Sequence, residues 1–575
     1  MVDYDEPVKD YETYFKEHHA RTVSEFFEDL VRTSGVNEQE NIALVTEIKD
    51  LETSKSSKAS TRKGWKAGRI ASIIVAIGLA ILAFSLGDWN YLWLLPAVGL
   101  IVLVFAKFNP EIKKLDDIVA QLDAEITEKK DVAWSQMAPL NALHSWDVAR
   151  KLFQSTFPTA ALDAYFANGR HDDLTENYDL SDDFMNGRSA LFSQGGSIGG
   201  NPFVISRYIQ HWMGVMSYSG SIIIYWTEYV RDSDGNQRAV QRSQTLTATV
   251  TKPYPMFTPH TALIYGHEAA PNLSFSRQPS SLSDLDDGAF NNWRKEKAVK
   301  KVEKMARKAV KSGNSGITAM ANREFEALFN AVDRDNEIEF RLLFTPLAQQ
   351  EMVNLMKDKD VAYGDDFAFS KYGKLNVVEP RHLGSTALDN SPRNFVSYDI
   401  EEARATFNNL HNAYFKSIYF GLAPLLTVPL YRENRSLPAL KTNKDSENLS
   451  PWEHEAMANV IGGAAFAHPD SITENLLKTS RISHSNGVDT VSVTAYGYAG
   501  FPRVDIVPML GGDGNWHEVP VNWTEYIQVE RESQFYVGVT SSEDTPVDMA
   551  GFQKQGISAE NVYVRGPLGA ALPGA

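Results

Sequence analysis

A long apolar stretch near the start of the chain constrains the fold more than any other feature. Residues 69–108 read RIASIIVAIGLAILAFSLGDWNYLWLLPAVGLIVLVFAKF, in which two charge-free runs, residues 70–86 and 91–106, flank the segment GDWN. As a helix with a rise of 1.5 Å per residue, the first run spans roughly 25 Å, near the thickness of a bilayer's hydrocarbon core. The apolar residues surround the helix, whereas helices of soluble proteins keep a polar face. The stretch therefore predicts a transmembrane helical hairpin.

Two other interpretations of this stretch are weaker. A secretory signal lies at the N-terminus and is a single segment, but charged, helix-prone chain precedes this pair of runs. A helical hairpin in the core of a soluble protein is the second alternative, and the missing polar face argues against it.

The ends of both runs carry residues suited to a membrane interface. Aromatic and basic side chains favour that position. The predicted interface anchors are Trp65, Arg69, Trp89, Tyr91, Trp93 and Lys107. Both flanks are rich in lysine and arginine, whereas the connecting turn has only Asp88, and basic flanks stay in the cytoplasm. We therefore expect a two-helix, multi-pass protein of the cell membrane with both termini, and the large C-terminal part, in the cytoplasm.

Composition limits the chemistry of the remaining chain. The sequence has 73 acidic and 56 lysine or arginine residues, a net charge of −17, which makes nucleic-acid binding unlikely as a general property. It has no cysteine, which excludes disulfides, thiolate catalysis and cysteine-ligated zinc or iron–sulfur sites. Among the 13 histidines no pair lies two to four residues apart, the usual spacing of paired metal ligands. We predict no metal site and no cofactor.

The hydrophobic pattern predicts an α+β protein, with the transmembrane hairpin and a helical stalk attached to a large mixed α+β soluble domain. Apolar residues three and four apart from Ile112 to Ile126 resemble the seam of a coiled coil, so we expect the segments flanking the membrane to pair antiparallel. Two independent surface helices are the alternative. The expected regions are an N-terminal helical part (residues 1–68), the hairpin (69–108), the stalk (109–167), the α+β domain (168–540, with a break near 281–320) and a flexible tail (541–575).

Turn residues predict two β-hairpins in the α+β domain. Asp234-Gly235 separates strand-like runs, and in the second run the threonines alternate with apolar residues, as in a strand with one buried face. A second hairpin is expected about residues 511–523. The acidic residues 171–184 are expected to form a loop, and the glycine-rich residues 193–203 a hinge.

The segment SPWE predicts the start of a helix. Ser450 would cap the helix, Pro451 would occupy its first position, and Glu453 would reach back to the capping residue.

The tetrapeptide YGDD, residues 363–366, matches a polymerase motif whose adjacent aspartates hold catalytic Mg²⁺. Two-metal catalysis needs a further carboxylate, supplied in polymerases by a D-x4-D pattern, and the separate upstream match, Asp5 with Asp10, precedes the membrane segment. Asp365 and Asp366 are thus weak catalytic candidates, and a solvated turn is the alternative.

A basic segment opposes the acidic character of the chain. Its basic side chains would face anionic lipid head groups if the domain lies at the inner leaflet. The predicted membrane-surface residues are Arg294, Lys297, Lys300, Lys301, Lys304, Arg307 and Lys308. A solvated surface helix is the alternative, and nucleic acid is disfavoured because no aromatic residues are interleaved.

Several blocks of the sequence resemble a family of uncharacterised bacterial two-helix membrane proteins with a large soluble domain. The blocks are TLTATVTKPYP (245–255), LSFSR (273–277), FRLLFTPLAQ (340–349), YGDDF (363–367), YFGLAPLLTVPLY (419–431) and GGDGNWHEV (511–519). The resemblance implies a membrane-anchored architecture and assigns no activity.

Three classes of function follow from these features. The first is a membrane-anchored scaffold or interaction protein with an unidentified protein partner, held at the lipid bilayer. The second is a tethered enzyme acting on a lipid-linked or phosphorylated substrate, with Asp365, Asp366 and residues 171–184 as candidates. The third is a channel component, which would require homo-oligomers and is disfavoured because the two runs carry no ionisable residue.

Overall fold

The computed structural model describes residues 6–85, 93–231, 236–280, 322–436, 448–540 and 549–573, with the single residues 282, 297, 300, 304 and 320. The fold is mixed α and β, with two long apolar helices and two antiparallel sheets. The chain divides into two compact units. The helical unit comprises residues 21–145 and 392–411, and the sheet unit comprises residues 1–20, 146–391 and 412–575.

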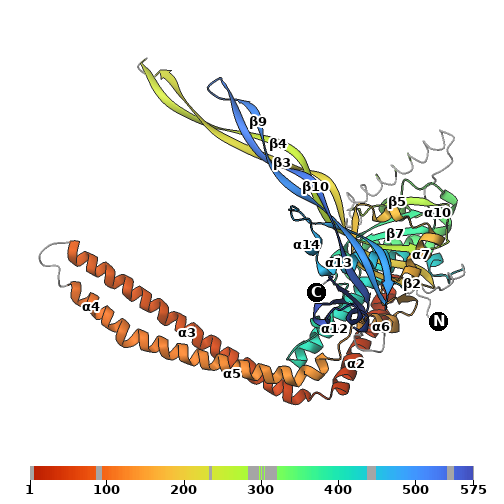
Figure 1. Ribbon diagram of the computed structural model, residues 1–575, viewed down its shortest axis with the longest axis horizontal. Helices are drawn as coiled ribbons and strands as arrows, with labels where there is room; N and C mark the ends of the chain where they lie inside the picture. The colour runs from red at the N-terminus through yellow and green to blue at the C-terminus, as the bar shows by residue number, and fades with distance from the viewer. Residues whose placement is uncertain are drawn as a thin grey trace. The chain divides into compact units, whose positions relative to one another are not determined.

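The helical unit consists of a few long helices (Figure 1). They are α2 (Lys16–Ser34), α3 (Glu38–Ser85), α4 (Leu94–Leu103), the π-helical turn Val104–Phe108, α5 (Asn109–Asn141) and the start of α12 (Ile400–Leu426). Gly35, with φ of 69°, separates α2 from α3. Because α3 continues unbroken across residue 68, the expected boundary there has no counterpart in the structure.

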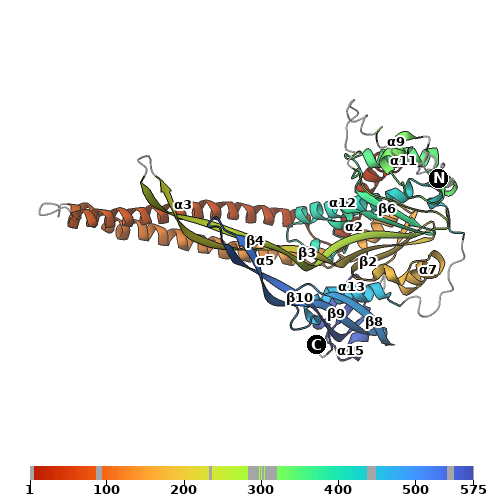
Figure 2. The same cartoon turned by 90° about the horizontal axis from the view of Figure 1, so that it is seen from above.

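Helices α3 and α5 lie side by side and antiparallel (Figures 1 and 2). Ile48, Ile126 and Ala133 are buried between them. Nearer the apolar segments of the two helices, the ring centroids of Trp65 and Phe108 lie 5.4 Å apart. Charged pairs flank the seam: Lys129–Glu47 at 3.0 Å, Lys130–Glu52 at 2.6 Å, Arg62–Asp116 at 3.0 Å, and Lys55–Asp123. Apolar contacts thus hold the pair together, and complementary charges lie at its margins.

The sheet unit contains most of the remaining elements. Its helices are α1 (Pro7–Asp10), α6 (Val148–Thr156), α7 (Asn168–Tyr178), α9 (Arg323–Phe329), α10 (Glu337–Leu343), α11 (Pro346–Lys357), the end of α12, α13 (Pro451–Ile461), α14 (Gly463–Phe466) and α15 (Ala550–Lys554). Its strands are β1 (Ala160–Leu162), β2 (Arg188–Ile198), β3 (Asn201–Arg231), β4 (Gln237–Gly266), β5 (Ser274–Arg277), β6 (Phe367–Tyr372), β7 (Leu375–Pro380), β8 (Leu476–Ser485), β9 (Val488–Leu510), β10 (Trp516–Val539), β11 (Tyr563–Arg565) and β12 (Leu568–Ala571).

The strands form two antiparallel sheets, in the orders β1-β2-β3-β4-β7-β6-β5 and β11-β12-β10-β9-β8. Helix α13 contacts β2 of the first sheet and β8, β11 and β12 of the second. The N-terminal residues also belong to this unit: Tyr11 and Phe15 are buried against Tyr419, whose hydroxyl donates to the carbonyl of Pro7 at 2.9 Å. Residues 7–15 therefore complete the core of the sheet unit.

Two hairpins extend beyond the sheets as a four-stranded arm (Figures 1 and 2). We define the arm as residues 211–231, 237–262, 500–510 and 516–530. Ile224, Leu246 and Ala248 of the first hairpin pack on Val519 and Val521 of the second. At the crossing, a Cβ on Gly220 would lie 2.0 Å from the carbonyl oxygen of Pro520, so only glycine permits this approach.

Both predicted hairpins are present. Arg231 pairs with Gln237, and Leu510 pairs with Trp516, so the strands lie in register on both sides of each expected turn. Leu246 is buried while Thr245 and Thr247 are exposed, as the alternation predicted.

Three local predictions were wrong. Residues 171–184 were expected to form a loop, but α7 and the 3₁₀ turn Asp182–Met185 include most of them, because Leu174 and Tyr178 are buried in the core. The expected hinge at 193–203 is the β2–β3 pair, which turns at Gly199 and Gly200 with φ of 54° and 83°.

The expected flexible tail is also folded over residues 549–573. Strands β11 and β12 extend the second sheet, and Leu568 and Ala570 are buried in its core. These strands have three and four residues, too few to show a period in the sequence.

Candidate functional site

Three consecutive ionisable residues, Glu453, His454 and Glu455, are buried on α13. As predicted, the Ser450 hydroxyl caps this helix by accepting from the Glu453 amide at 3.3 Å. The Glu453 side chain does not reach back to the cap. Its Oε1 accepts from the Phe166 amide at 3.0 Å, and its other oxygen pairs with Arg565 of β11. Burial raises the pKa of Glu453, and the Arg565 guanidinium opposes the increase.

The other two residues reach different strands. His454 Nε2 lies 2.9 Å from Asp489 Oδ2, and His484 Nδ1 lies 2.8 Å from the other oxygen of the same carboxylate. Burial alone would raise the pKa of Asp489, but hydrogen bonds from the two histidines lower it. Glu455 accepts from the Ala190 amide at 2.9 Å and pairs with Lys478 at 2.5 Å. The α13 charges thus connect β2 with the second sheet.

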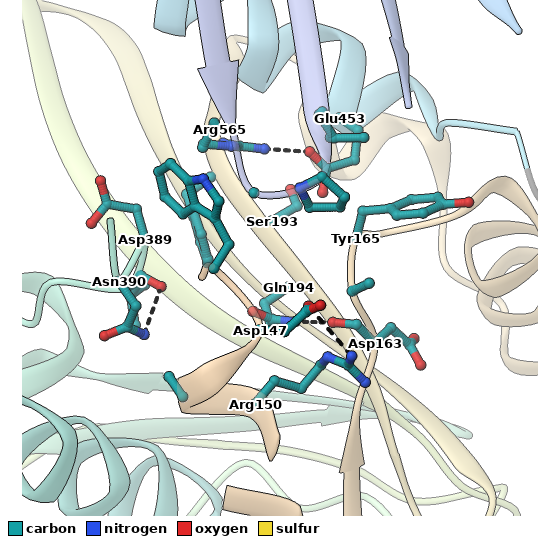
Figure 3. A pocket seen from close by; sticks show the side chains of 18 of the residues that line it. Asp147, Arg150, Asp163, Tyr165, Ser193, Gln194, Asp389, Asn390, Glu453 and Arg565 are labelled. Atoms are coloured by element: carbon teal, nitrogen blue, oxygen red, sulfur yellow. Dashed lines mark hydrogen bonds and ion pairs between the residues drawn. The ribbon is translucent and has the colours of Figure 1, made fainter. Parts of the chain in front are cut away.

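A small cavity lies beside the Glu453–Arg565 pair (Figure 3). Its volume is about 60 Å³, far below the several hundred Å³ of a typical cofactor pocket. Polar side chains from several segments line it: Asp147, Arg150, Asp163, Tyr165, Ser193, Gln194, Asp389, Asn390, Glu453 and Arg565. The space suits a few waters or one small polar molecule.

Most charges around the cavity are already paired. Arg170 donates to both carboxylate oxygens of Asp163 at 2.9 Å, and Arg150 Nη2 lies 3.3 Å from Asp147. The Ser193 hydroxyl is buried, and no residue within the described ranges hydrogen-bonds it. Because arginines hold Asp147, Asp163 and Glu453, the geometry favours polar recognition over general acid–base catalysis.

The structure directs the two candidate catalytic aspartates to different partners. Asp365 accepts from Arg277 Nη2 at 2.7 and 2.9 Å and from the Ser280 amide at 2.8 Å. Asp366 instead lies 2.5 Å from His382 Nδ1. In the described part of the chain, no group of three or more histidine, aspartate or glutamate side chains is placed to hold a metal ion. Nothing in the sequence around YGDD indicates that Arg277 and His382 are the partners of these aspartates.

Some predicted membrane residues fall in the described ranges. Trp65 contacts Phe108, Arg69 donates to Asn109 Oδ1 at 3.3 Å, Trp93 is exposed, and Lys107 lies in the turn that precedes α5. Trp89 and Tyr91 lie outside the described residues, as do Arg294, Lys301, Arg307 and Lys308. Lys297, Lys300 and Lys304 are helical and exposed.

The sheet unit contains an acidic cleft that nothing in the sequence indicated. It has a volume of about 480 Å³, and Glu6, Glu12, Glu324 and Glu351 are among its lining residues. Glu351 is buried and accepts from Asn354 Nδ2 at 3.0 Å. Burial, and then the charge of Glu6, raises the pKa of Glu351 to about 7.

Replacing Glu351 with glutamine is expected to stabilise the protein above pH 7. The folded-state pKa of about 7 exceeds the ordinary value of 4.5, so the wild type loses stability as pH rises from 4.5 to 7. Allowing for solvent screening in the open cleft, we expect Glu351→Gln to gain about 1–2 kcal/mol at pH 8 and almost nothing at pH 4.5. Denaturant unfolding at the two pH values measures the difference. Glu12→Gln, in the same cleft but exposed, is the control, and an equal gain for both variants would contradict the prediction.

Comparison with known proteins identifies no relative. No family model, no curated protein and no solved structure matches the chain. The family resemblance therefore stays a prediction.

Proposed function

We propose that this chain is a membrane-anchored interaction protein whose apolar helical hairpin holds the sheet unit at the bilayer. One observation carries the proposal: two helices, Glu38–Phe84 and Leu94–Asn141, are long and apolar enough to cross a membrane, and only 11% and 17% of their most apolar segments are buried. A core hairpin of a soluble protein would have these segments largely covered.

The exposed side chains on the helices are large. Ile74 and Phe84 of α3 are 63% and 75% exposed, and Leu95 and Phe105 of the second helix, Leu94–Asn141, are 71% and 69% exposed. Soluble proteins rarely expose a continuous apolar surface of this kind. In a bilayer the same side chains contact lipid, and the helical backbone satisfies its own hydrogen bonds.

The charges of the helix pair also support an anchor. The ion pairs between α3 and α5 involve residues before position 70 and after position 108. The basic flanks favour the cytoplasmic side for both termini and for the sheet unit.

The side chains of the sheet unit favour a role in protein interaction over a role in catalysis. Most charged groups around the small cavity are already ion-paired, and the aspartates of YGDD have separate partners. The arm instead presents exposed apolar side chains, including Val215, Tyr225 and Trp516, at 73%, 71% and 70%. Such surfaces are typical of protein contacts.

The absence of cysteine allows a direct test of anchor and sidedness. Single variants Asn90→Cys, in the predicted external turn, and Ser243→Cys, exposed on β4, are treated with a membrane-impermeant maleimide in intact and lysed cells. We expect Asn90→Cys to react in intact cells and Ser243→Cys only after lysis. Reaction of Ser243→Cys in intact cells would overturn the cytoplasmic placement. Extraction of the protein from membranes by alkaline carbonate would overturn the proposal of a transmembrane anchor.

A further inference from the structure

Prolines occupy the free edges of three of the four arm strands. In β4 they are Pro253, Pro255 and Pro259, in β9 Pro502 and Pro508, and in β10 Pro520. A proline inside a paired strand keeps the ladder only where its nitrogen faces away from the partner strand. These prolines therefore remove backbone donors from the outer edges and hinder strand addition there.

The fourth strand, β3, has no proline within the arm. Its neighbour β2 ends the pairing at Gln210, and the His211 amide then donates to the Gly187 carbonyl at 2.8 Å. Beyond this point, no strand in the described residues pairs with that edge.

The register shows which groups of β3 face the open edge. Val215 and Met213 lie opposite Pro253 and Pro255, so these are positions where the two strands do not hydrogen-bond each other. The His211 amide points to the same outer side. Odd-numbered residues of β3 therefore present their amide and carbonyl groups at the open edge.

The side chains along this edge are uncharged and largely exposed. From Trp212 to Thr227 the strand contains no lysine, arginine, aspartate or glutamate. Val215 and Ile223 are 73% and 58% exposed on one face, with three serines between them at 217, 219 and 221. A long edge with neither proline nor charge is suited to pairing with another strand.

We propose that two copies of this chain pair antiparallel through β3, with Ser219 of each copy on the two-fold axis. In this register Val215 faces Ile223 of the second copy, Met213 faces Tyr225, and Ser217 faces Ser221. Apolar side chains thus meet apolar ones, serines meet serines, and no like charges are opposed, as a self-complementary interface requires. The pairing goes beyond the membrane-anchor proposal and does not depend on it.

Disulfide trapping tests the register in the cysteine-free chain. Antiparallel hydrogen-bonded partners have Cα atoms about 5.5 Å apart, within the range of a disulfide. Purified full-length Ser219→Cys in detergent is therefore expected to form a covalent dimer on mild oxidation. The control is Thr249→Cys on β4, directly opposite Ser219 and also exposed, where the Ser219 and Thr249 hydroxyls lie 3.0 Å apart. Equal cross-linking of the two variants, or none with Ser219→Cys, would overturn the proposal.

Mass photometry of the same full-length protein tests the open edge itself. Ser217→Pro removes an outward-facing donor from β3, and Thr251→Pro removes the equivalent donor from its cross-strand partner on β4. We expect Ser217→Pro to weaken dimerisation at least about tenfold and Thr251→Pro to change it less than about twofold. A monomeric wild type up to micromolar concentration, or equal effects of the two prolines, would overturn the proposal. The disulfide test remains decisive if either proline variant fails to fold.

Discussion

Replacing Asp365 with alanine is expected to lower the free energy of unfolding by about 3–5 kcal/mol, because it leaves a buried arginine without its counter-ion. The side chains of Arg277 and Asp365 are 0% and 1% exposed. Arg277 Nη1 also donates to the Phe367 carbonyl at 2.7 Å, so the guanidinium is held in place and cannot move to solvent. Chemical denaturation of the purified full-length protein measures the loss.

Two further variants separate a structural role for Asp365 from a catalytic one. Asp366→Ala removes the neighbouring carboxylate, which is partly exposed and bonded to His382, and we expect a smaller loss. The double variant Asp365→Ala with Arg277→Met removes both charges and should recover part of the stability. A folded Asp365→Ala protein of unchanged stability would contradict the structural role and return Asp365 to consideration as a functional group.

Replacing Lys371 with methionine is expected to stabilise the protein at neutral pH by about 1–3 kcal/mol. Lys371 of β6 is fully buried, and its ammonium group donates to the Ala269 carbonyl at 2.9 Å. Within the described residues no carboxylate pairs with it, and burial lowers its pKa to about 7. The nearby ammonium group, after burial, also helps lower the pKa of His267 to about 4.

The sign of the pH dependence follows from the lowered pKa of Lys371. Since the ordinary pKa is 10.5, the unfolded chain binds more protons between pH 7 and 10.5, and the wild type gains stability as pH rises through that range. The advantage of Lys371→Met should therefore be largest below pH 7 and disappear near pH 10.5. Thermal unfolding across this range measures it. The control is Lys374→Met, three residues further on, between β6 and β7, and only half-buried. A pH-independent gain for Lys371→Met would contradict the assignment.

The local parts of the fold could be predicted because their signals lie close together in the sequence. The apolar runs of residues 70–86 and 91–106 indicated two long apolar helices, the turn residues near 235 and 513 indicated the hairpins, and Ser450 indicated the start of α13. Each of these features depends on backbone preferences, or on hydrophobic periods, within a few residues.

The candidate sites depended on pairings between distant segments. Glu453 was expected to bond its own helix start, but Phe166 and Arg565 take its oxygens, and Asp365 meets Arg277 from a separate strand. The same limit explains the tail, where the short strand β12 pairs with β10 and β11 pairs with β12. The sequence by itself determined helix, strand and turn where neighbours decide them. The tertiary structure alone decided which charges are buried together and which strand edge stays open, because those outcomes depend on contacts between residues far apart in the chain.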